Sequence, residues 1–200
     1  MLENRYSKYY IERIRDNLST RRPKELAEGP VPAAVLVPLF LKGGELHLLL
    51  TKRAGHLKHH AGEISFPGGV CNPEEHSRDA ALRETWEEIG INSTRVDILG
   101  ALDDVYSIHH YKVTPYVGFI SGKLPLKLNR SEIDKIIEVP VKHLMDPSFF
   151  RIEEWGWQGR NYPVYFYRYQ EDDIWGMTAE IVMNFLEVTF RGDQKAANGS

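Results

Sequence analysis

Several acidic residues gather in one short segment of the chain, between Gly69 and Ile91. Glu84, Glu87 and Glu88 are three and four residues apart, so in a helix they share one face. Like charges at these spacings repel at a cost of a few tenths of a kcal/mol per pair. Such a face is more often solvated surface, but a hard divalent cation held by carboxylate oxygens would offset the repulsion. The spacing therefore makes a metal site a candidate.

A helix over residues 77–89 is expected to carry these acids. Ser77 is the predicted N-cap residue, and Gly90 is placed to end the helix. Leu82, Trp86 and Ile89 are expected to form an apolar face opposite the glutamates, by which the helix packs on the rest of the protein.

Apolar runs predict the sheet that supports this helix. Residues 33–40 form a nearly continuous apolar run typical of a buried strand, and Gly43-Gly44 turns it into a second strand over 45–51. Further strands are expected at 95–102, 113–120, 132–138 and 162–169. Strands and helices mix without regular alternation, which favours an α+β sandwich over a doubly wound sheet.

The chain is expected to divide into three parts. Residues 1–32 form an N-terminal helix (6–18) and a polar linker arm, 33–191 the main domain, and 192–200 a disordered tail. Residues 174–186 are expected to form the closing helix. The N-terminal helix could dock on the domain or build a subunit interface, so a homodimer stays open.

The composition excludes several classes of protein. A chain of 200 residues with 42% hydrophobic and 26% charged residues is an ordinary globular protein with room for a core. A net charge of −3 gives no support to nucleic-acid or membrane-surface binding. The single cysteine, Cys71, favours a reducing compartment and is read as a small loop residue rather than a nucleophile. Without a signal peptide or a long apolar span, a cytoplasmic protein is expected.

The acidic segment carries a complete family motif, Gly-x5-Glu-x7-Arg-Glu-U-x-Glu-Glu-x-Gly-U, in which U is a bulky apolar residue. Its fixed positions are filled by Gly69, Glu75, Arg83, Glu84, Glu87, Glu88, Gly90 and Ile91. Thr85 occupies the other U position. The chain thus resembles the Nudix hydrolases. The resemblance implies a Nudix-like α/β/α sandwich with a mixed central sheet, and metal-dependent hydrolysis of a nucleoside diphosphate linked to another group.

A second motif precedes this Nudix box. The pattern LLTxR[SA]xxxRxxxGxxxFPGG is matched by Leu49-Leu50-Thr51, Arg53-Ala54, Gly62 and Phe66-Pro67-Gly68-Gly69. Lys58 stands where the pattern has arginine, which keeps the charge but loses two-pronged phosphate contact. This stretch resembles the coenzyme A pyrophosphatase branch of the family. It implies coenzyme A or its thioesters as the substrate, with 3′,5′-ADP and 4′-phosphopantetheine as products.

The resemblance also implies which residues bind metal. Glu84, Glu87 and Glu88 would bind Mg²⁺ or Mn²⁺, with the Gly68 carbonyl as a further ligand. Arg83 would orient a box glutamate through a two-pronged contact.

Base and substrate residues follow from the same resemblance. Glu84 is the favoured candidate for the general base, and Glu132, a downstream acid that the fold often brings to the metals, is the second. Arg53 and Lys58, assisted by His60, would meet the 3′-phosphate of coenzyme A. Alternatively, the N-terminal half of the motif shapes the loop that leads into Phe66-Pro67-Gly68-Gly69.

Other interpretations remain open at this point. Lys58 leaves room for ADP-ribose or dinucleotides as substrates, and a binding module without catalysis would more often have lost box acids. Asp103-Asp104 could contact metal or substrate, or simply form a turn. The aromatic residues of 155–169 could stack on adenine, although packing in a sheet or at a subunit interface is favoured. His56, His59 and His60 lack the spacing of a zinc site.

Overall fold

The structure is a computed structural model of the chain. It describes the backbone of residues 2–27, 31–57, 60–107, 110–157 and 159–197, and the side chains of 9–27, 31–57, 60–107, 110–156 and 159–190. The strands form an eight-stranded sheet and a separate three-stranded sheet. Within the described part, no helix combines the length and apolarity needed to cross a membrane.

The predicted apolar strand lies in the middle of the larger sheet. This strand, β1 (Val31–Lys42), pairs antiparallel with β2 (Glu45–Arg53) and parallel with β7 (Tyr111–Ile120). Beyond them, β8 (Ile133–Pro140) pairs with β2 and β5 (Val96–Ala101) with β7, both antiparallel. The sheet is therefore mixed, as predicted.

Three short strands complete this sheet: β3 (Ile64–Ser65), β4 (Gly68–Val70) and β6 (Val105–Tyr106). β4 pairs with β1, so that Gly68 lies opposite Val35. A Cβ atom on Gly68 would lie 2.3 Å from the carbonyl oxygen of Ala34, so the strand needs glycine there. This pairing holds the start of the Nudix box against the middle of the sheet.

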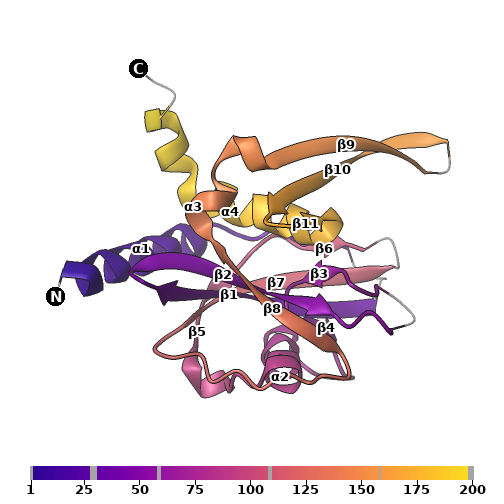
Figure 1. Cartoon of the computed structure of the whole chain (residues 1–200), viewed down its shortest axis with the longest axis horizontal. Helices are drawn as coiled ribbons and strands as arrows, with labels where there is room; N and C mark the ends of the chain where they lie inside the picture. Colours follow the sequence, from indigo (N-terminus) through magenta and orange to yellow (C-terminus); the bar gives the residue numbers. More distant parts are fainter. Residues whose placement is uncertain (1, 28–30, 58–59, 108–109, 158, 198–200) are drawn as a thin grey trace.

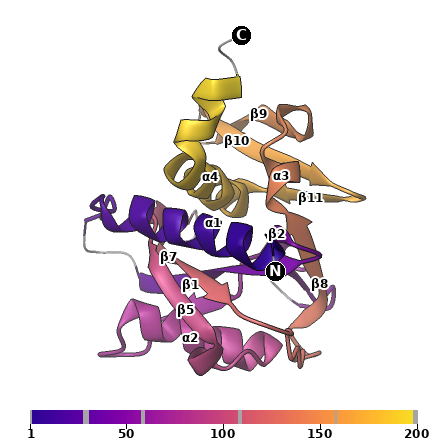
Figure 2. The ribbon, with the colours of Figure 1, turned by 90° about the vertical axis from the view of Figure 1, so that its left-hand side faces the viewer.

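Helices cover both faces of the larger sheet (Figures 1 and 2). α2 (Ser77–Ile89) lies on one face, where Ala80 and Ala81 pack against Ala34 and Leu36. These small side chains let the helix approach the sheet closely. On the other face lie α1 and α4 (Figure 2).

The core on that second face is larger. α1 (Leu2–Ser19) contributes the buried Ile14 and Leu18, and α4 (Gly176–Ala197) contributes Phe185 among others. Together with α2 these helices complete an α/β/α sandwich, so the predicted fold class is confirmed.

The smaller sheet lies beyond α4 (Figure 2). Its antiparallel strands are β9 (Phe150–Trp157), β10 (Arg160–Tyr169) and β11 (Asp172–Trp175), in the order β11-β10-β9. Phe166 and Tyr167 are buried in it, so these two aromatic residues serve sheet packing. Short helical segments connect the strands: η1 (Ser93–Arg95), α3 (Val141–Leu144) and η2 (Pro147–Phe149).

The predicted bounds of the closing helix are wrong at both ends. Ile174 and Trp175 belong to β11, where they pair with Tyr167 and Phe166, and the helix begins only at Gly176. Strand pairing thus overrides the helical pattern of these apolar residues. The helical backbone then continues past the predicted end at Leu186 to Ala197, so it overlaps most of the segment expected to be a disordered tail.

Asp103 and Asp104 hold the N-terminal arm. Asp103 accepts a hydrogen bond from the backbone N–H of Lys24 at 2.7 Å and forms an ion pair with Arg21. Asp104 accepts from the N–H of Leu26 at 3.0 Å. The aspartate pair therefore finds its partners in the arm, and this accounts for both carboxylates without a metal ion or a substrate.

Candidate active site

The acidic helix is capped differently from the prediction. Its N-cap residue is His76, whose side chain makes no capping hydrogen bond, and Ser77 is the first helical residue. The prediction of Ser77 as N-cap is wrong because its hydroxyl instead pairs with the hydroxyl of Tyr116 on β7, at 2.8 Å. Gly90 ends the helix as predicted, in the left-handed conformation with φ 76°.

The buried face of α2 also differs from the predicted apolar face. Ile89 is buried as expected, but Trp86 is 53% exposed, while Thr85 and Glu88 are buried. The reason is that Ala80 and Ala81 make the contact with the sheet, and their side of the helix includes Glu88 rather than Trp86. One acid of the box is therefore held between helix and sheet.

Thr85 fits its apolar position because its hydroxyl is satisfied locally. The side chain is fully buried, and its Oγ1 donates to the carbonyl oxygen of Ala81 at 2.6 Å. This departure from the box consequently leaves no unpaired polar group.

Arg83 gathers three carboxylates of the box. Its Nε and Nη2 donate to the two oxygens of Glu75, at 2.9 and 3.1 Å. Its Nη1 donates to Oε1 of Glu84 at 2.7 Å and reaches Oε2 of Glu87 at 3.4 Å. Hydrogen bonds from Arg83, then from the N–H of Asn72, lower the pKa of Glu75. The arginine thus fixes one oxygen of Glu84 and leaves the other, Oε2, outside this ion pair.

Glu88 is the most unusual group in the site. It is only 4% exposed, and its Oε2 has no hydrogen-bond partner. Burial raises the pKa of Glu88 to about 8; the Arg53 charge opposes this rise, and the Glu84 and Glu132 charges add to it. The N–H of Gly68 donates to the carboxylate and also favours its charged form. Three chain segments therefore meet around this carboxylate.

Arg53 reaches this cluster from the last residue of β2. The β2–β8 pairing is irregular there, because Lys52 lies opposite Lys135 whereas Arg53 lies opposite Ile133. Such a bulge re-aims side chains and is common near active sites. Lys52 forms an ion pair with Asp172 of the small sheet, and Arg53 keeps a buried Nε without a hydrogen-bond partner.

Glu132 lies in the loop before β8, where it is held by Asn129 of the same loop and by Ala54, which follows β2. Its Oε1 accepts a hydrogen bond from Nδ2 of Asn129 at 3.0 Å, and its carbonyl oxygen accepts from the N–H of Ala54 at 2.8 Å. The sequence prediction missed Asn129. The signal that could have found it is the Asn-Arg-Ser sequence, because Asn129 accepts from the N–H of Ser131 at 3.2 Å in a turn of the kind that asparagine favours.

Gly69 lies directly against the Glu84 carboxylate. A Cβ atom at this position would stand 2.6 Å from Cδ of Glu84. Any side chain here would push the carboxylate aside, so the first glycine of the box makes room for its first metal-binding candidate.

One remaining predicted residue, His60, lies on the loop between β2 and β3. His60 is exposed, and its Nδ1 lies 2.8 Å from Oε2 of Glu63. Lys58 and His59 lie outside the described residues.

Among the described residues, no three His, Cys, Asp or Glu side chains already converge as a metal site. Glu75 and Glu84 are engaged by Arg83, and the side chain of Glu87 is 53% exposed. The donors nevertheless fit a hard divalent cation, because Glu88 presents a buried oxygen without a partner and Glu84 keeps Oε2 outside its ion pair. A cation would also offset the repulsion that Glu84 and Glu132 exert on Glu88.

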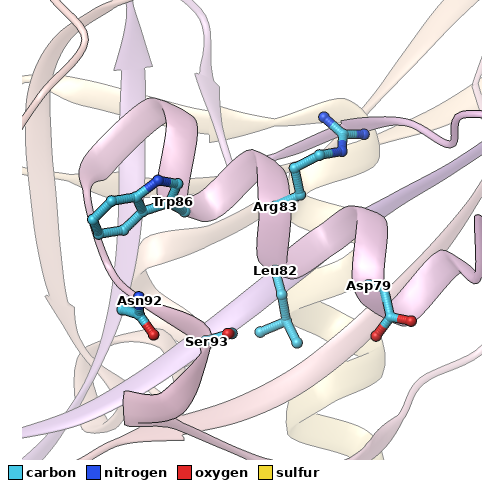
Figure 3. Close-up of a pocket in the computed structure, with 6 residues that line it drawn as sticks. All are labelled: Asp79, Leu82, Arg83, Trp86, Asn92 and Ser93. Carbon is cyan, nitrogen blue, oxygen red and sulfur yellow. The ribbon is translucent and has the colours of Figure 1, made fainter.

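A pocket beside α2 (Figure 3) shares Arg83, but none of the box glutamates, with this cluster. It is lined by Asp79, Leu82, Arg83, Trp86, Asn92 and Ser93. Figure 3 shows Arg83 pointing away from Asp79 and Leu82. None of the box glutamates lines the pocket, so the candidate metal site lies outside it.

Comparison with known proteins agrees with the motif. The family model of the NUDIX domain matches residues 30–158. The chain belongs to the Nudix family. It is 42% identical over 161 residues to NudL of Photorhabdus laumondii, described as an uncharacterized Nudix hydrolase, covering 80% of this chain and 86% of the relative. NudL of Yersinia pestis is 37% identical over 156 residues, or 78% of each chain.

Solved structures agree in fold. A MutT/nudix family protein from Enterococcus faecalis has a TM-score of 0.52 at 19% identity, covering 84% of this chain and 65% of that one. The Nudix hydrolase RenU from M. smegmatis has a TM-score of 0.50 at 21% identity, covering 60% and 76%. As a Nudix hydrolase, this protein hydrolyses phosphoanhydride bonds of nucleoside diphosphate derivatives. Enzymes of this family generally require a divalent metal ion such as Mg²⁺ or Mn²⁺.

Proposed function

We propose that this Nudix hydrolase cleaves the pyrophosphate bond of coenzyme A or its thioesters. The products would be 3′,5′-ADP and 4′-phosphopantetheine or its acyl derivative. One observation carries the proposal: the motif upstream of the box acts on the acids of the box, through a backbone hydrogen bond from Gly68 to Glu88 and through the charge of Arg53. Arg53 and Gly68, both from that motif, act on the charge of Glu88. A substrate motif built into the metal-binding cluster would meet the pyrophosphate directly.

In this proposal, Glu84, Glu87, Glu88 and the Gly68 carbonyl would hold Mg²⁺ or Mn²⁺. When bound, such a cation neutralises phosphate charge and orients the reacting groups. Arg83 holds Oε1 of Glu84 and would thereby leave Oε2 for the cation.

Glu132 is the acid that we assign to proton removal from the attacking water. Glu84 is engaged by Arg83 and would also be a metal ligand, whereas Glu132 is held through one oxygen by a neutral amide. A carboxylate held in this way keeps Oε2 for a water molecule.

The substrate carries its negative charges at the pyrophosphate and at the 3′-phosphate. Arg53, which the motif assigns to the 3′-phosphate, would instead meet the pyrophosphate end, since its charge acts on Glu88. Lys58 and His60 would meet the 3′-phosphate from the loop after β2.

The test is a substrate panel with the products identified by mass. Purified protein with Mg²⁺ or Mn²⁺ is incubated with coenzyme A, an acyl-coenzyme A, ADP-ribose and a dinucleotide. Release of 3′,5′-ADP from coenzyme A is expected. Rapid turnover of ADP-ribose with none of coenzyme A would refute the substrate but leave the reaction class intact.

Lys58 favours a second candidate, a pyrophosphatase for ADP-ribose or dinucleotides. If this position contacts coenzyme A, Lys58→Arg should raise kcat/KM for coenzyme A, because a planar two-pronged donor suits phosphate better. An unchanged rate would count against that contact.

A further inference from the structure

We propose that Asn129 is a positioning residue, which holds the carboxylate of Glu132 at a fixed place relative to Glu88. The inference rests on the proposed function, in which Glu132 accepts the proton of the attacking water.

The loop that carries Glu132 is attached to the end of the acidic helix. The N–H groups of Lys127 and Asn129 donate to the carbonyl oxygens of Ile89 and Glu88, both at 2.9 Å. These carbonyls belong to the last turn of α2, where no intrahelical donor is left for them. Gly90 permits the close approach, because a Cβ atom there would lie 2.8 Å from Cβ of Lys127. Loop and helix are therefore joined at Glu88 itself.

Every polar group of Asn129 takes part in this arrangement. Its Oδ1 accepts from the N–H and the hydroxyl of Ser131, at 3.2 and 2.5 Å. Its carbonyl oxygen accepts from the N–H groups of Glu132 and Ile133, at 3.0 and 2.8 Å. The amide orientation is thus fixed, and Nδ2 is left to donate to Oε1 of Glu132 at 3.0 Å.

A second attachment fixes Glu132 from the side of β2. Its carbonyl oxygen accepts from the N–H of Ala54, the residue after Arg53. The backbone of Glu132 is therefore tied to the strand that carries Arg53, and its side chain, through Asn129, to the helix that carries Glu88. A neutral donor suits this role, because it orients the carboxylate without the full charge of a lysine or arginine.

Asn129→Asp tests the role with little change of shape. The aspartate keeps an acceptor for Ser131 but replaces the donor to Glu132 by a like charge. Misplacement of a reacting group by about 1 Å can cost about 100-fold in rate. We expect kcat to fall by about 10- to 100-fold, with KM changed by less than about 3-fold.

A double-mutant cycle with Glu132→Gln separates positioning from general structural damage. The glutamine amide can donate to the carboxylate that Asn129→Asp introduces, so the hydrogen bond is restored in reverse. Asn129→Asp should then change the residual kcat of the Glu132→Gln enzyme by less than about 3-fold. An equal loss in both backgrounds would overturn the proposal, since that result describes damage unrelated to Glu132.

Asn161→Asp is the matched control, because it removes an amide donor from Glu154, an exposed glutamate of the smaller sheet, at 3.3 Å; its kcat should stay within about 3-fold of the parent. If Asn129→Asp does not fold, Asn129→Gln provides the same cycle with the amide displaced by one methylene. The cycle is measured with whichever substrate the enzyme turns over fastest. Its outcome therefore tests the role of Asn129 even if coenzyme A is not the substrate. Full activity of Glu132→Gln would refute the base assignment and the positioning role together.

Discussion

Replacing Glu88 by glutamine should make the metal-free protein more stable while removing its activity. Glu88 is buried, and burial raises its pKa to about 8 from an ordinary value of 4.5. A carboxyl group whose pKa is raised by folding contributes its full stability below the unfolded value and loses it as pH rises through the folded value. Glutamine keeps the size of the side chain but never ionises. The gain in stability should therefore grow with pH.

The size of the gain follows from the two pKa values. Each pH unit between them is worth about 1.4 kcal/mol. The difference between the folded and unfolded pKa values thus destabilises the metal-free fold by about 1 kcal/mol at pH 5, about 3 kcal/mol at pH 7 and about 5 kcal/mol well above pH 8, because the unfolded chain ionises Glu88 more readily than the folded one. These values include the favourable charge of Arg53, which acts in the opposite direction.

Urea unfolding in EDTA at pH 5, 7 and 9 measures this directly. Glu88→Gln should exceed the parent in the free energy of unfolding, with a difference that widens by about 2 kcal/mol between pH 5 and pH 7. Glu87→Gln is the matched control: its side chain is 53% exposed, so the variant should stay within about 1 kcal/mol of the parent at each pH. Added Mg²⁺ should stabilise the parent and leave Glu88→Gln unchanged.

Two results would refute this reasoning. A pH-independent difference between parent and Glu88→Gln would show that the carboxylate is not desolvated as described. Full hydrolytic activity of Glu88→Gln would show that this carboxylate is not needed by the reaction.

Three further predictions concern neighbouring features. Gly69→Ala places a Cβ 2.6 Å from Cδ of Glu84, so kcat should fall by at least about 10-fold while thermal unfolding changes little; an unchanged kcat would contradict the contact. Arg53→Gln removes a positive charge that acts on Glu88 and would repel Mg²⁺ there more strongly than it repels a proton, so Mg²⁺ titrations at pH 7 should show tighter binding, and equal affinity would place Arg53 outside the cluster. Asp103→Ala removes the carboxylate that binds Arg21 and the N–H of Lys24, which should lower the free energy of unfolding by about 1–3 kcal/mol and expose residues 20–24 to protease at unchanged kcat. Protection of the arm in that variant would contradict its anchoring by Asp103.

Local signals predicted much of the fold. The run that forms β1 is almost continuously apolar because both faces of the strand are covered, and this shows in the sequence. Gly90 ends α2 as expected because a left-handed residue after a helix is a local requirement that glycine meets best. Both features depend on residues close together in the chain.

Features that depend on contacts between distant parts of the chain could not be predicted from local sequence patterns. Trp86 was assigned to the packed face of α2, but the close approach of the sheet admits alanine there and leaves the indole exposed. Ile174 and Trp175 carry a helical pattern and yet pair with β10.

In the site, too, the sequence predicted the residues, and distant contacts set their environments. The motif identified the acids, and the structure then separated their environments: Glu88 is buried, Glu84 is held by Arg83, and Glu87 faces solvent. That separation depends on how α2 docks on the sheet, which no spacing in the sequence encodes. Asn129 was missed because its partner carbonyl, that of Glu88, is far away in the chain.

The central claim is hydrolysis of coenzyme A at the cluster around Glu88. It is tested most directly by mass identification of the products that the parent and the folded Glu88→Gln variant form from coenzyme A and Mg²⁺. The parent should release 3′,5′-ADP and 4′-phosphopantetheine, and the variant should release neither above background. Two results would contradict the account. In one, the parent leaves coenzyme A intact but hydrolyses another nucleotide; in the other, parent and variant form equal amounts of product from coenzyme A.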